Sequence, residues 1–303
     1  MLDRILVTGG SGMLGQALRK HLPDAIYLSR KDGDLREPSA ARAIIEKHRP
    51  DAVLHLAARV GGVRENAAHN VEFWTDNALI NTNVLSAARE SRVRRLIAPL
   101  STCSFPYFDD RATTEKDLHE GIPYDGNLGY GYAKRALDVH ARLVARQDGL
   151  AWSTFTPVTM FGPHDNFGLD DGHVVGALVH KCVLALESRG SLDVWGDGSA
   201  VRQFVYVDDV ARAVVELLRR DITDHVAVAA DEGITIRELA QAVARAVGFE
   251  GRINFDASKP SGMKRKVMKS EIFGRVFGSF RFTLFDEALR ETAAWFRGNR
   301  GET

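Results

Sequence analysis

The sequence contains only two cysteines, Cys103 and Cys182, which are too few for a disulfide framework and indicate a reducing compartment. Neither sign of charge is in excess, because Lys plus Arg and Asp plus Glu each number 40. A chain without an overall basic field is not expected to be a dedicated nucleic-acid binder. Apolar runs of membrane-spanning length are missing, and the start MLDRILVTGG has no apolar core of a signal peptide. We therefore expect a cytoplasmic protein.

The 303 residues are 45% hydrophobic and 26% charged, an ordinary globular composition that can bury a large core. Apolar segments of strand length alternate with segments of helical period, which is typical of β-α-β units. We predict strands at residues 4–8, 25–28, 52–57, 95–100 and 152–156, and helices at 13–21, 39–48, 70–91 and 130–146. The fold class is therefore α/β, a doubly wound parallel sheet of Rossmann type with ligands at the carboxyl ends of its strands.

Beyond Pro157 the alternation becomes irregular, which predicts a smaller, mixed α/β C-terminal lobe that binds substrate. We expect a helix from about residue 173, strands near 192–195 and 204–207, a helix beginning at the capping box Thr235 to Glu238, and a last helix at 285–296. Residues 1–160 are assigned to the Rossmann domain, with returning segments near 203–228, and residues 161–303 to the substrate lobe. The two lobes are expected to fold together.

Glycines cluster between the first predicted strand and the first predicted helix, in TGGSGMLGQAL. In such a loop the first glycine permits a tight turn, the second lets backbone N–H groups approach a pyrophosphate, and the third lets helix and strand pack closely. A glycine-rich turn without a ligand is the alternative. The place between strand and helix favours a dinucleotide cofactor. The residues predicted to bind it are Gly9, Gly10, Ser11, Gly12, Met13, Leu14 and Gly15.

The residues after the second strand favour NADP over NAD. NAD-binding proteins usually place a carboxylate there for the ribose hydroxyls, whereas a 2'-phosphate needs a cation. This chain has Arg30 and Lys31 at that point, although both could be solvated surface cations. Asp34 could hydrogen-bond the adenine ring. The domain at 1–160 is therefore predicted to bind NADP(H).

Tyr130 and Lys134 share one face of a predicted helix, because they lie four residues apart. Tyrosine has a pKa near ~10 when unperturbed, and exchanging a proton with a ketone near neutral pH is easier when that pKa is lower. We expect the Lys134 ammonium and an oxidised nicotinamide to lower it. Ser101, at a strand end, could hydrogen-bond the developing alkoxide. Tyr132 has Ala136 in place of a cation partner and is expected to pack on the helix surface.

The chain resembles the extended short-chain dehydrogenase/reductase superfamily, and within it the enzymes that epimerise and reduce GDP-ketosugars. The resemblance spans nearly the whole chain and rests on the runs TGGSGMLG, HLAARVGG, STCSFP, YGYAKR, FGPHDNF, VWGDGSAVRQFVYVDD and FRFTLF. STC, GPHDNF and a downstream His-Val are more discriminating than the glycine loop, which every relative shares. The resemblance implies catalytic roles for Ser101, Tyr130 and Lys134, and no metal. It adds to the cofactor site Ala57, Lys134, Pro157 and Met160.

The resemblance also implies a second pair, with Cys103 as base and His173 as acid in the inversion of C3 and C5 of a 4-ketosugar. The carbonyl acidifies those protons, and unperturbed Cys and His pKa values of ~8.5 and ~6.5 suit their transfer near neutral pH. Because residues two apart in a strand point the same way, Cys103 should emerge beside Ser101. The alternatives are a small buried hydrophobe at Cys103 and a surface residue at the start of a helix for His173. Cys182, inside an apolar helix, is expected to be a core residue.

A GDP-sugar requires cations for its diphosphate and an aromatic or amide group for its base. The positions that match the family's substrate-binding motifs are Lys181, Trp195, Arg202 and Lys266. Surface basic residues and a core tryptophan are the alternatives. Two positions depart from the family's pattern, Thr159 in place of an asparagine and Ser261 in place of an aspartate. Thr replaces only part of the hydrogen bonding of an amide, so these departures leave the identity of the sugar open.

Together these features predict an NADPH-dependent 3,5-epimerase and 4-reductase that converts GDP-4-keto-6-deoxy-D-mannose to GDP-L-fucose. Both reactions build negative charge on the C4 oxygen, so Ser101 and Tyr130 could serve both in one pocket. The nearest alternative is a GDP-ketosugar 4-reductase that inverts one centre or none, as a colitose-type pathway would need. A catalytically silent protein that binds NADP(H) is a third hypothesis. The segments at 70–91 and 130–146 resemble the helices of the family's dimer interface, so a homodimer is expected.

Overall fold

A six-stranded parallel sheet forms the centre of the computed structural model, which describes residues 3–108, 111–169, 172–230, 232–259 and 263–300. The strands lie in the order β10-β5-β4-β3-β1-β2. Their bounds are β1 Ile5–Thr8, β2 Ile26–Tyr27, β3 Ala52–His55, β4 Arg95–Pro99, β5 Ala151–Pro157 and β10 Val226–Val228. The predicted α/β, doubly wound fold class is confirmed. Ser261 lies outside the described residues.

The direction of strand addition reverses at β1, which has β2 on one side and β3 on the other. In open parallel sheets this reversal separates the loops at the carboxyl ends and creates the usual ligand crevice. The loop after β1 is the glycine-rich one, and the loop after β3 contains Ala57. The fold therefore places both predicted cofactor loops at the same crevice.

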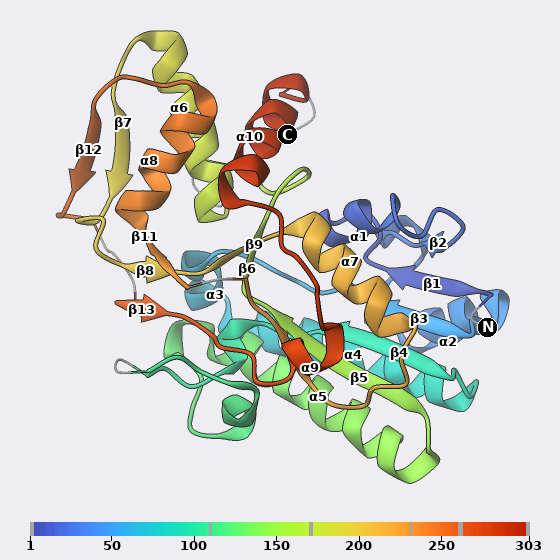
Figure 1. Ribbon diagram of the computed structural model, residues 1–303. Coiled ribbons are helices and arrows are strands. Elements are labelled where there is room, and N and C mark those ends of the chain that lie inside the picture. Colours follow the sequence, from blue (N-terminus) through green and yellow to red (C-terminus); the bar gives the residue numbers. More distant parts are fainter. Residues whose placement is uncertain (1–2, 109–110, 170–171, 231, 260–262, 301–303) are drawn as a thin grey trace.

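Helices cover both faces of the sheet (Figure 1). On one face α4 packs between α2 and α5, whereas on the other α1 packs against α7. Their bounds are α1 Met13–Leu18, α2 Pro38–His48, α4 Asn70–Glu90, α5 Leu128–Asp148 and α7 Val207–Leu218. The core between them is apolar, and Leu6, Val7 and Leu54 are completely buried in the strands. No helix in the described part of the chain combines the length and apolarity needed to span a membrane.

Most of the later elements form a second, mixed α/β part, whose helices α6 Val174–Ser188 and α8 Ile236–Val247 and strands β7 Leu192–Trp195 and β12 Ile253–Asp256 are at the upper left of Figure 1. Helices α6, α8 and α10 Phe285–Gly298 pack together, beside the parallel pair β7 and β12. Thr235 caps α8 through the predicted capping box with Glu238. Short strands complete this part, namely β6 Thr159–Phe161 with β9 Phe204–Tyr206, and β8 Val201–Arg202 between β11 Ile234–Thr235 and β13 Arg265–Lys266.

The predicted strands and helices of the first half are all present, with small shifts at their ends. Shorter elements were not predicted: the helices α3 Val63–Ala68 and α9 Phe273–Phe277, and the 3-10 turns η1 Arg30–Asp32, η2 Thr102–Ser104, η3 Glu115–His119 and η4 Asp125–Asn127. The last strand of the main sheet, β10, comes from the segment 203–228 that was assigned to the Rossmann domain. The division at residue 160 stays a prediction.

Candidate active site

Two glycines of the loop after β1, Gly9 and Gly15, leave no room for a side chain. Gly9 has a φ of +69°, and a Cβ there would lie 2.7 Å from the backbone nitrogen of Ala57. A Cβ at Gly15 would lie 2.7 Å from the Cα of Gly10, so α1 packs directly on the turn. Gly12 precedes α1 and supplies no side-chain acceptor to the N–H groups of its first turn. A glycine turn that opens a helix without a side-chain cap favours a phosphate-bearing ligand, because the N–H groups of the first helical turn have no partner within the helix. Ser11, Met13 and Leu14 belong to the same turn and helix start.

The predicted cations for the 2'-phosphate lie immediately after β2. Arg30 and Lys31 are both exposed and open the turn η1. Ser29 caps this turn, since its hydroxyl accepts from the Lys31 N–H at 3.2 Å and its own N–H donates to the Asp32 carboxylate at 2.7 Å. The cap fixes the backbone under the two cations and leaves their side chains directed to solvent. Their contact with a phosphate stays a prediction.

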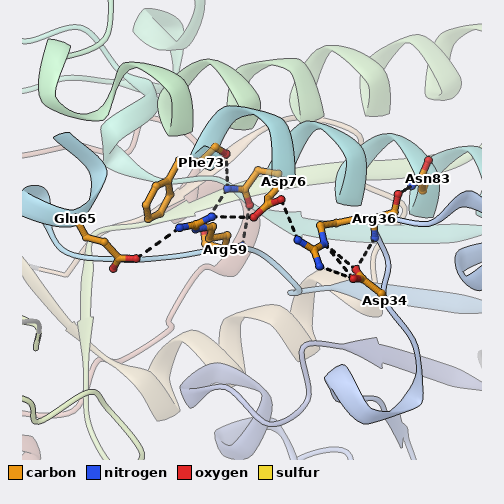
Figure 2. Close-up of polar contacts among 8 residues, drawn as sticks. Asp34, Arg36, Arg59, Glu65, Phe73, Asp76 and Asn83 are labelled. Carbon is orange, nitrogen blue, oxygen red and sulfur yellow. Dashed lines mark hydrogen bonds and ion pairs between the residues drawn. The ribbon is translucent and has the colours of Figure 1, made fainter. Parts of the chain in front are cut away.

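Figure 2 shows a chain of ion pairs beside this turn. Arg36 donates from Nε to both oxygens of Asp34, at 3.0 and 3.1 Å, and from Nη1 to Asp76 on α4 at 3.2 Å. Arg59 donates to the other oxygen of Asp76 at 3.0 Å and lies over the Phe73 ring. Hydrogen bonds from Arg36 lower the pKa of Asp34 to about 2. Asp34 is thus an ionised acceptor already engaged by Arg36, and its bond to adenine stays a prediction.

Tyr130 and Lys134 lie in the first turns of α5, on the face that meets β4. Lys134 is buried and donates from Nζ to the Pro99 carbonyl oxygen at 2.9 Å, with Nζ 5.8 Å from the centre of the Tyr130 ring. Burial lowers the pKa of Lys134 to about 8. Burial raises the pKa of Tyr130 above 10, the nearby Cys103 raises it further, and a hydrogen bond with Ser101 lowers it. The net shift of the Tyr130 pKa is therefore upward for the residues of the chain alone, and the lowering expected from Lys134 together with an oxidised nicotinamide stays a prediction.

Ser101 and Cys103 lie in a turn rather than in a strand. β4 ends at Pro99, and Ser101 caps the 3-10 turn η2 by accepting from the Cys103 N–H at 3.1 Å. The strand alternation that was used to place Cys103 beside Ser101 is therefore wrong. Cys103 is nevertheless half-buried and close enough to Tyr130 to raise its pKa. The turn brings together the hydroxyl, the thiol and the phenol that the sequence nominated.

Gly131 sets the distance between this turn and α5. A Cβ at Gly131 would lie 2.6 Å from the carbonyl oxygen of Cys103 and 3.0 Å from Cβ of Pro123. The central glycine of the Tyr-Gly-Tyr run is thus required by packing, although it was not among the predicted site residues. Tyr132 is 38% exposed and stacks with Arg135 on the outer surface of α5, as expected for a surface residue.

His173 lies at the start of α6 and pairs with a carboxylate. Its Nδ1 is 2.7 Å from Oδ1 of Asp165, whose side chain is buried. Its backbone N–H donates to the Asn166 carbonyl at 3.2 Å, and the same carbonyl lies 2.6 Å from where a Cβ of Gly176 would be. Since a carboxylate accepts only, Nδ1 carries the proton that is donated to Asp165. The GPHDNF loop therefore supplies a partner for His173 that the sequence analysis did not identify.

The four predicted substrate residues form two groups. Lys181 on α6 lies with Nζ 5.1 Å from the centre of the Trp195 ring, and Trp195 is 42% exposed at the end of β7. Arg202 is half-buried on β8, and its register partner on β13 is Lys266. Lys266 donates from Nζ to the Cys103 sulfur at 3.3 Å. The second group is therefore continuous with the turn η2 that contains Cys103.

The remaining predicted positions are at or after the carboxyl ends of strands, apart from Cys182. Ala57 follows β3 and donates its N–H to the Thr8 hydroxyl at 3.2 Å. Pro157 ends β5, while Met160 and Thr159 are half-buried in β6. Cys182 is completely buried in the core, as expected.

A buried histidine lies beneath Lys134. His55 contacts the Thr8 hydroxyl through Nδ1 at 2.9 Å and the Asn81 amide oxygen through Nε2 at 3.1 Å. Burial and the Lys134 charge lower the pKa of His55 to about 3. The ring is therefore neutral and connects β1, β3 and α4 under the catalytic helix.

Comparisons with known proteins identify the family of the chain. Residues 5–229 match the family described as the NAD dependent epimerase/dehydratase family. The GDP-L-fucose synthase of Dictyostelium discoideum is 34% identical, over 97% of this chain and 95% of that protein. The GDP-L-colitose synthase of Yersinia pseudotuberculosis is 28% identical, over 97% of each chain. A structure of a GDP-L-fucose synthetase from Naegleria fowleri bound to NADP is 36% identical, with a TM-score of 0.92, over 99% of this chain and 94% of that one.

The family match covers most of the chain, and the GDP-L-fucose synthase relative matches it over nearly its full length at more than 30% identity. The chain therefore belongs to the NAD dependent epimerase/dehydratase family, in the branch that contains the GDP-L-fucose synthases.

Proposed function

We propose that this protein converts GDP-4-keto-6-deoxy-D-mannose to GDP-L-fucose with NADPH, by epimerisation at C3 and C5 and reduction at C4. The observation that carries the proposal is the meeting of Ser101, Cys103 and Tyr130 at one turn, where a thiol lies beside two hydroxyls. A reductase alone needs the hydroxyls but not the thiol. Relatives named GDP-L-fucose synthase and the NADP-bound neighbour support the substrate and the cofactor.

Epimerisation uses the thiol and the imidazole. Cys103 takes the proton from a carbon next to the ketone, the electron pair moves to O4, and the hydroxyls of Ser101 and Tyr130 donate to the resulting enolate oxygen. His173 then returns a proton from the opposite face, which inverts the centre. Cys103 then releases its proton to solvent and His173 takes one up, so that repetition at the second carbon completes the conversion. Asp165 holds Nδ1 of His173, so the other ring nitrogen, Nε2, carries the exchanged proton.

Reduction uses the same oxygen. NADPH supplies a hydride to C4 when it is bound in the glycine loop. Tyr130 gives its proton to O4, and Ser101 hydrogen-bonds the oxygen as negative charge develops. The Lys134 ammonium lies beside the Tyr130 ring and favours the phenolate that remains. Because burial raises the pKa of Tyr130, the phenol stays protonated until O4 requires its proton.

The residues that would hold the cofactor follow from the fit of the loop. The backbone of residues 9–15 would contact the pyrophosphate, since it forms the tight glycine turn before α1 and no side chain caps the first N–H groups of that helix. Arg30 and Lys31 would contact the 2'-phosphate, and the Ser29 cap keeps their backbone in place. Ala57, Pro157 and Met160 would line the path to the nicotinamide.

A GDP-ketosugar reductase that inverts one centre or none is the second candidate. The similarity to the GDP-L-colitose synthase favours it, together with Thr159 where the family has an asparagine. The closer similarity to GDP-L-fucose synthases favours the double epimerase.

Product analysis separates the two candidates. The enzyme is incubated with the ketosugar and NADPH in deuterated water, and the product is examined by NMR. Deuterium at both C3 and C5 in a fucose-configured product supports the proposal, whereas deuterium at one centre or none overturns it. Cys103→Ser should lose deuterium incorporation. Tyr130→Phe should lose NADPH oxidation, and Tyr132→Phe on the exposed side of α5 is the matched control.

We also propose that the protein is a homodimer formed by α4 and α5. Their outer faces carry exposed apolar side chains, and a groove of about 1070 Å³ runs between them. Apolar patches of this kind on paired helices are typical of stable interfaces. The exposed apolar residues that line the groove are Val71, Trp74, Tyr132, Val139 and Leu143.

We propose a cytoplasmic location for the protein. The two unpaired cysteines support it, because reducing compartments keep thiols free.

A further inference from the structure

Lys266 contacts the catalytic thiol rather than pointing only toward the substrate's diphosphate. Its Nζ donates to Sγ of Cys103 at 3.3 Å, across 163 residues of sequence. Both side chains are half-buried, so the pair is shielded from solvent but still reachable. An ammonium at this distance stabilises a negatively charged sulfur much more than a neutral one.

The fold holds Lys266 in this position. Its strand β13 pairs in parallel with β8, so that Lys266 lies opposite Arg202. On the other side Thr113 donates its N–H to the Val267 carbonyl at 3.0 Å and accepts from the Lys269 N–H at 2.8 Å. Thr113 belongs to the segment that follows the turn η2. The chain around Lys266 is therefore fixed to both β8 and the segment that carries Cys103.

The groups around Cys103 differ in charge and in how closely they approach the sulfur. Tyr130 is the other titratable group close to Cys103, and burial keeps it protonated and neutral. Lys134 donates to the Pro99 carbonyl and lies beside the Tyr130 ring. Lys266, in contrast, contacts the sulfur directly. Arg202, its neighbour across the strand pair, remains in place for the diphosphate.

We infer that Lys266 is a positioning residue for epimerisation, whose ammonium holds the Cys103 sulfur in place and stabilises the negative charge that the sulfur carries when it acts as the base. The inference rests on the proposed function, because it assigns Cys103 as the base. During each inversion the sulfur gains the C–H proton and its negative charge passes to O4, while Lys266 keeps its own protons. The lysine therefore takes part in no bond exchange and acts through the charge and orientation of the sulfur.

Thiol alkylation tests this role without substrate. Iodoacetamide reacts with thiolates, and Cys182 is completely buried, so modification of the folded protein reports on Cys103. Lys266→Met should slow alkylation at pH 7.5 by roughly tenfold, the effect of one nearby charge, whereas Lys266→Arg should retain most of the rate. Lys264→Met is the matched control, because Lys264 is exposed two residues earlier. An unchanged rate in Lys266→Met overturns the inference.

Substrate experiments separate this role from diphosphate binding. Deuterium exchange at C3 and C5 is measured with NADP⁺ present, so that no reduction occurs, and the Kd for GDP is measured by calorimetry. We expect Lys266→Met to lose exchange at saturating substrate while its Kd for GDP stays within about twofold. A weakened Kd with normal exchange at saturation overturns the inference and assigns Lys266 to the diphosphate. Absence of exchange in the wild type would refute the proposed function, while the alkylation result would still stand or fall separately.

Discussion

Asp165 and His173 form a carboxylate–imidazole pair at the N-terminus of α6. Oδ1 and Nδ1 are 2.7 Å apart, the carboxylate side chain is 1% exposed and the imidazole is 41% exposed. A buried acceptor that meets one nitrogen of a partly exposed ring selects a single tautomer, because only the protonated nitrogen can donate to it. The orientation of the proposed acid is therefore set from the interior of the protein.

Asp165→Asn should impair proton return without removing the imidazole. An amide can face Nδ1 with either its oxygen or its nitrogen, so both tautomers become accessible. We expect deuterium exchange at C3 and C5 to fall roughly 10- to 100-fold, part of the usual contribution of a general acid, while the Kd for NADPH is unchanged. Nitrogen NMR of labelled histidine should show the loss of the single tautomer. Asp208→Asn, which removes a similar contact with His21 at 2.8 Å, is the control and should leave exchange intact.

Ketone reduction should depend on the charge of Lys134. Because burial lowers the pKa of Lys134 to about 8, the ammonium is lost as the pH rises through that value. We therefore expect the rate of NADPH oxidation at saturating substrate to decline above about pH 8. Lys134→Arg keeps the charge at all these pH values and should remove the decline. A wild-type profile that stays flat to pH 10 contradicts this assignment.

Acid should destabilise the protein through two buried histidines. Burial lowers the pKa of His55 to about 3 and that of His225 to about 4, from 6.5. Between the unfolded pKa of 6.5 and the lower folded pKa, each histidine binds more protons in the unfolded chain than in the folded one. The free energy of unfolding therefore falls as the pH decreases through this range. Each histidine contributes a slope of up to about 1.4 kcal/mol per pH unit. Denaturant titrations from pH 7 to 4.5 should show the free energy of unfolding decreasing. His225→Gln should reduce this pH dependence more than His69→Gln, which changes an exposed histidine.

Cofactor preference should depend on the two exposed cations after β2. Arg30→Ala combined with Lys31→Ala removes the charges proposed to meet the 2'-phosphate. We expect the KM for NADPH to rise by roughly 10- to 100-fold, as for the loss of charge-assisted hydrogen bonds, with little change for NADH. Lys20→Ala, which removes a cation that is 74% exposed elsewhere, should change neither value. An equal rise of the KM for NADPH and for NADH would show that the two cations do not bind the 2'-phosphate.

Dimer formation should fail when charge enters the apolar groove. Leu143 is 57% exposed on α5, so Leu143→Glu should not disturb the core, but it would place an unpaired carboxylate inside the proposed interface. Light scattering at micromolar concentration should give a dimer for the wild type and a monomer for Leu143→Glu. Leu284→Glu, at a position that is 74% exposed away from the groove, should remain dimeric. A monomeric wild type contradicts the proposal.

Much of this fold follows from local patterns in the sequence. The strand–glycine loop–helix start and the long amphipathic segments are set by interactions between near neighbours, so their periods are visible before folding. The small strands β8, β11 and β13 were not predicted, because each has only two residues and is defined by pairing with distant segments. The contact of Lys266 with Cys103 depends on that pairing and could not be read from spacing.

The site was predictable where family motifs carry chemistry and less so where packing decides. Cys103 was placed correctly beside Ser101 for a wrong reason, since a capped 3-10 turn rather than a strand joins them. Burial of Tyr130 raises its pKa, which the sequence could not indicate because desolvation depends on atoms that the sequence does not place. The one sequence signal for Asp165 is the GPHDNF run itself. That run indicates the family but not which of its side chains contacts His173.

At position 131 a single hydrogen atom stands where any other residue would carry carbon. A methyl group there would collide with the carbonyl oxygen of Cys103. Helix α5, which carries Tyr130, and the turn η2, which carries Cys103, would therefore have to move apart. The phenol could then still serve a ketone, but the sulfur would no longer reach the same ring. The proposed use of one pocket for both reactions thus depends on the absence of a side chain between these two backbone segments.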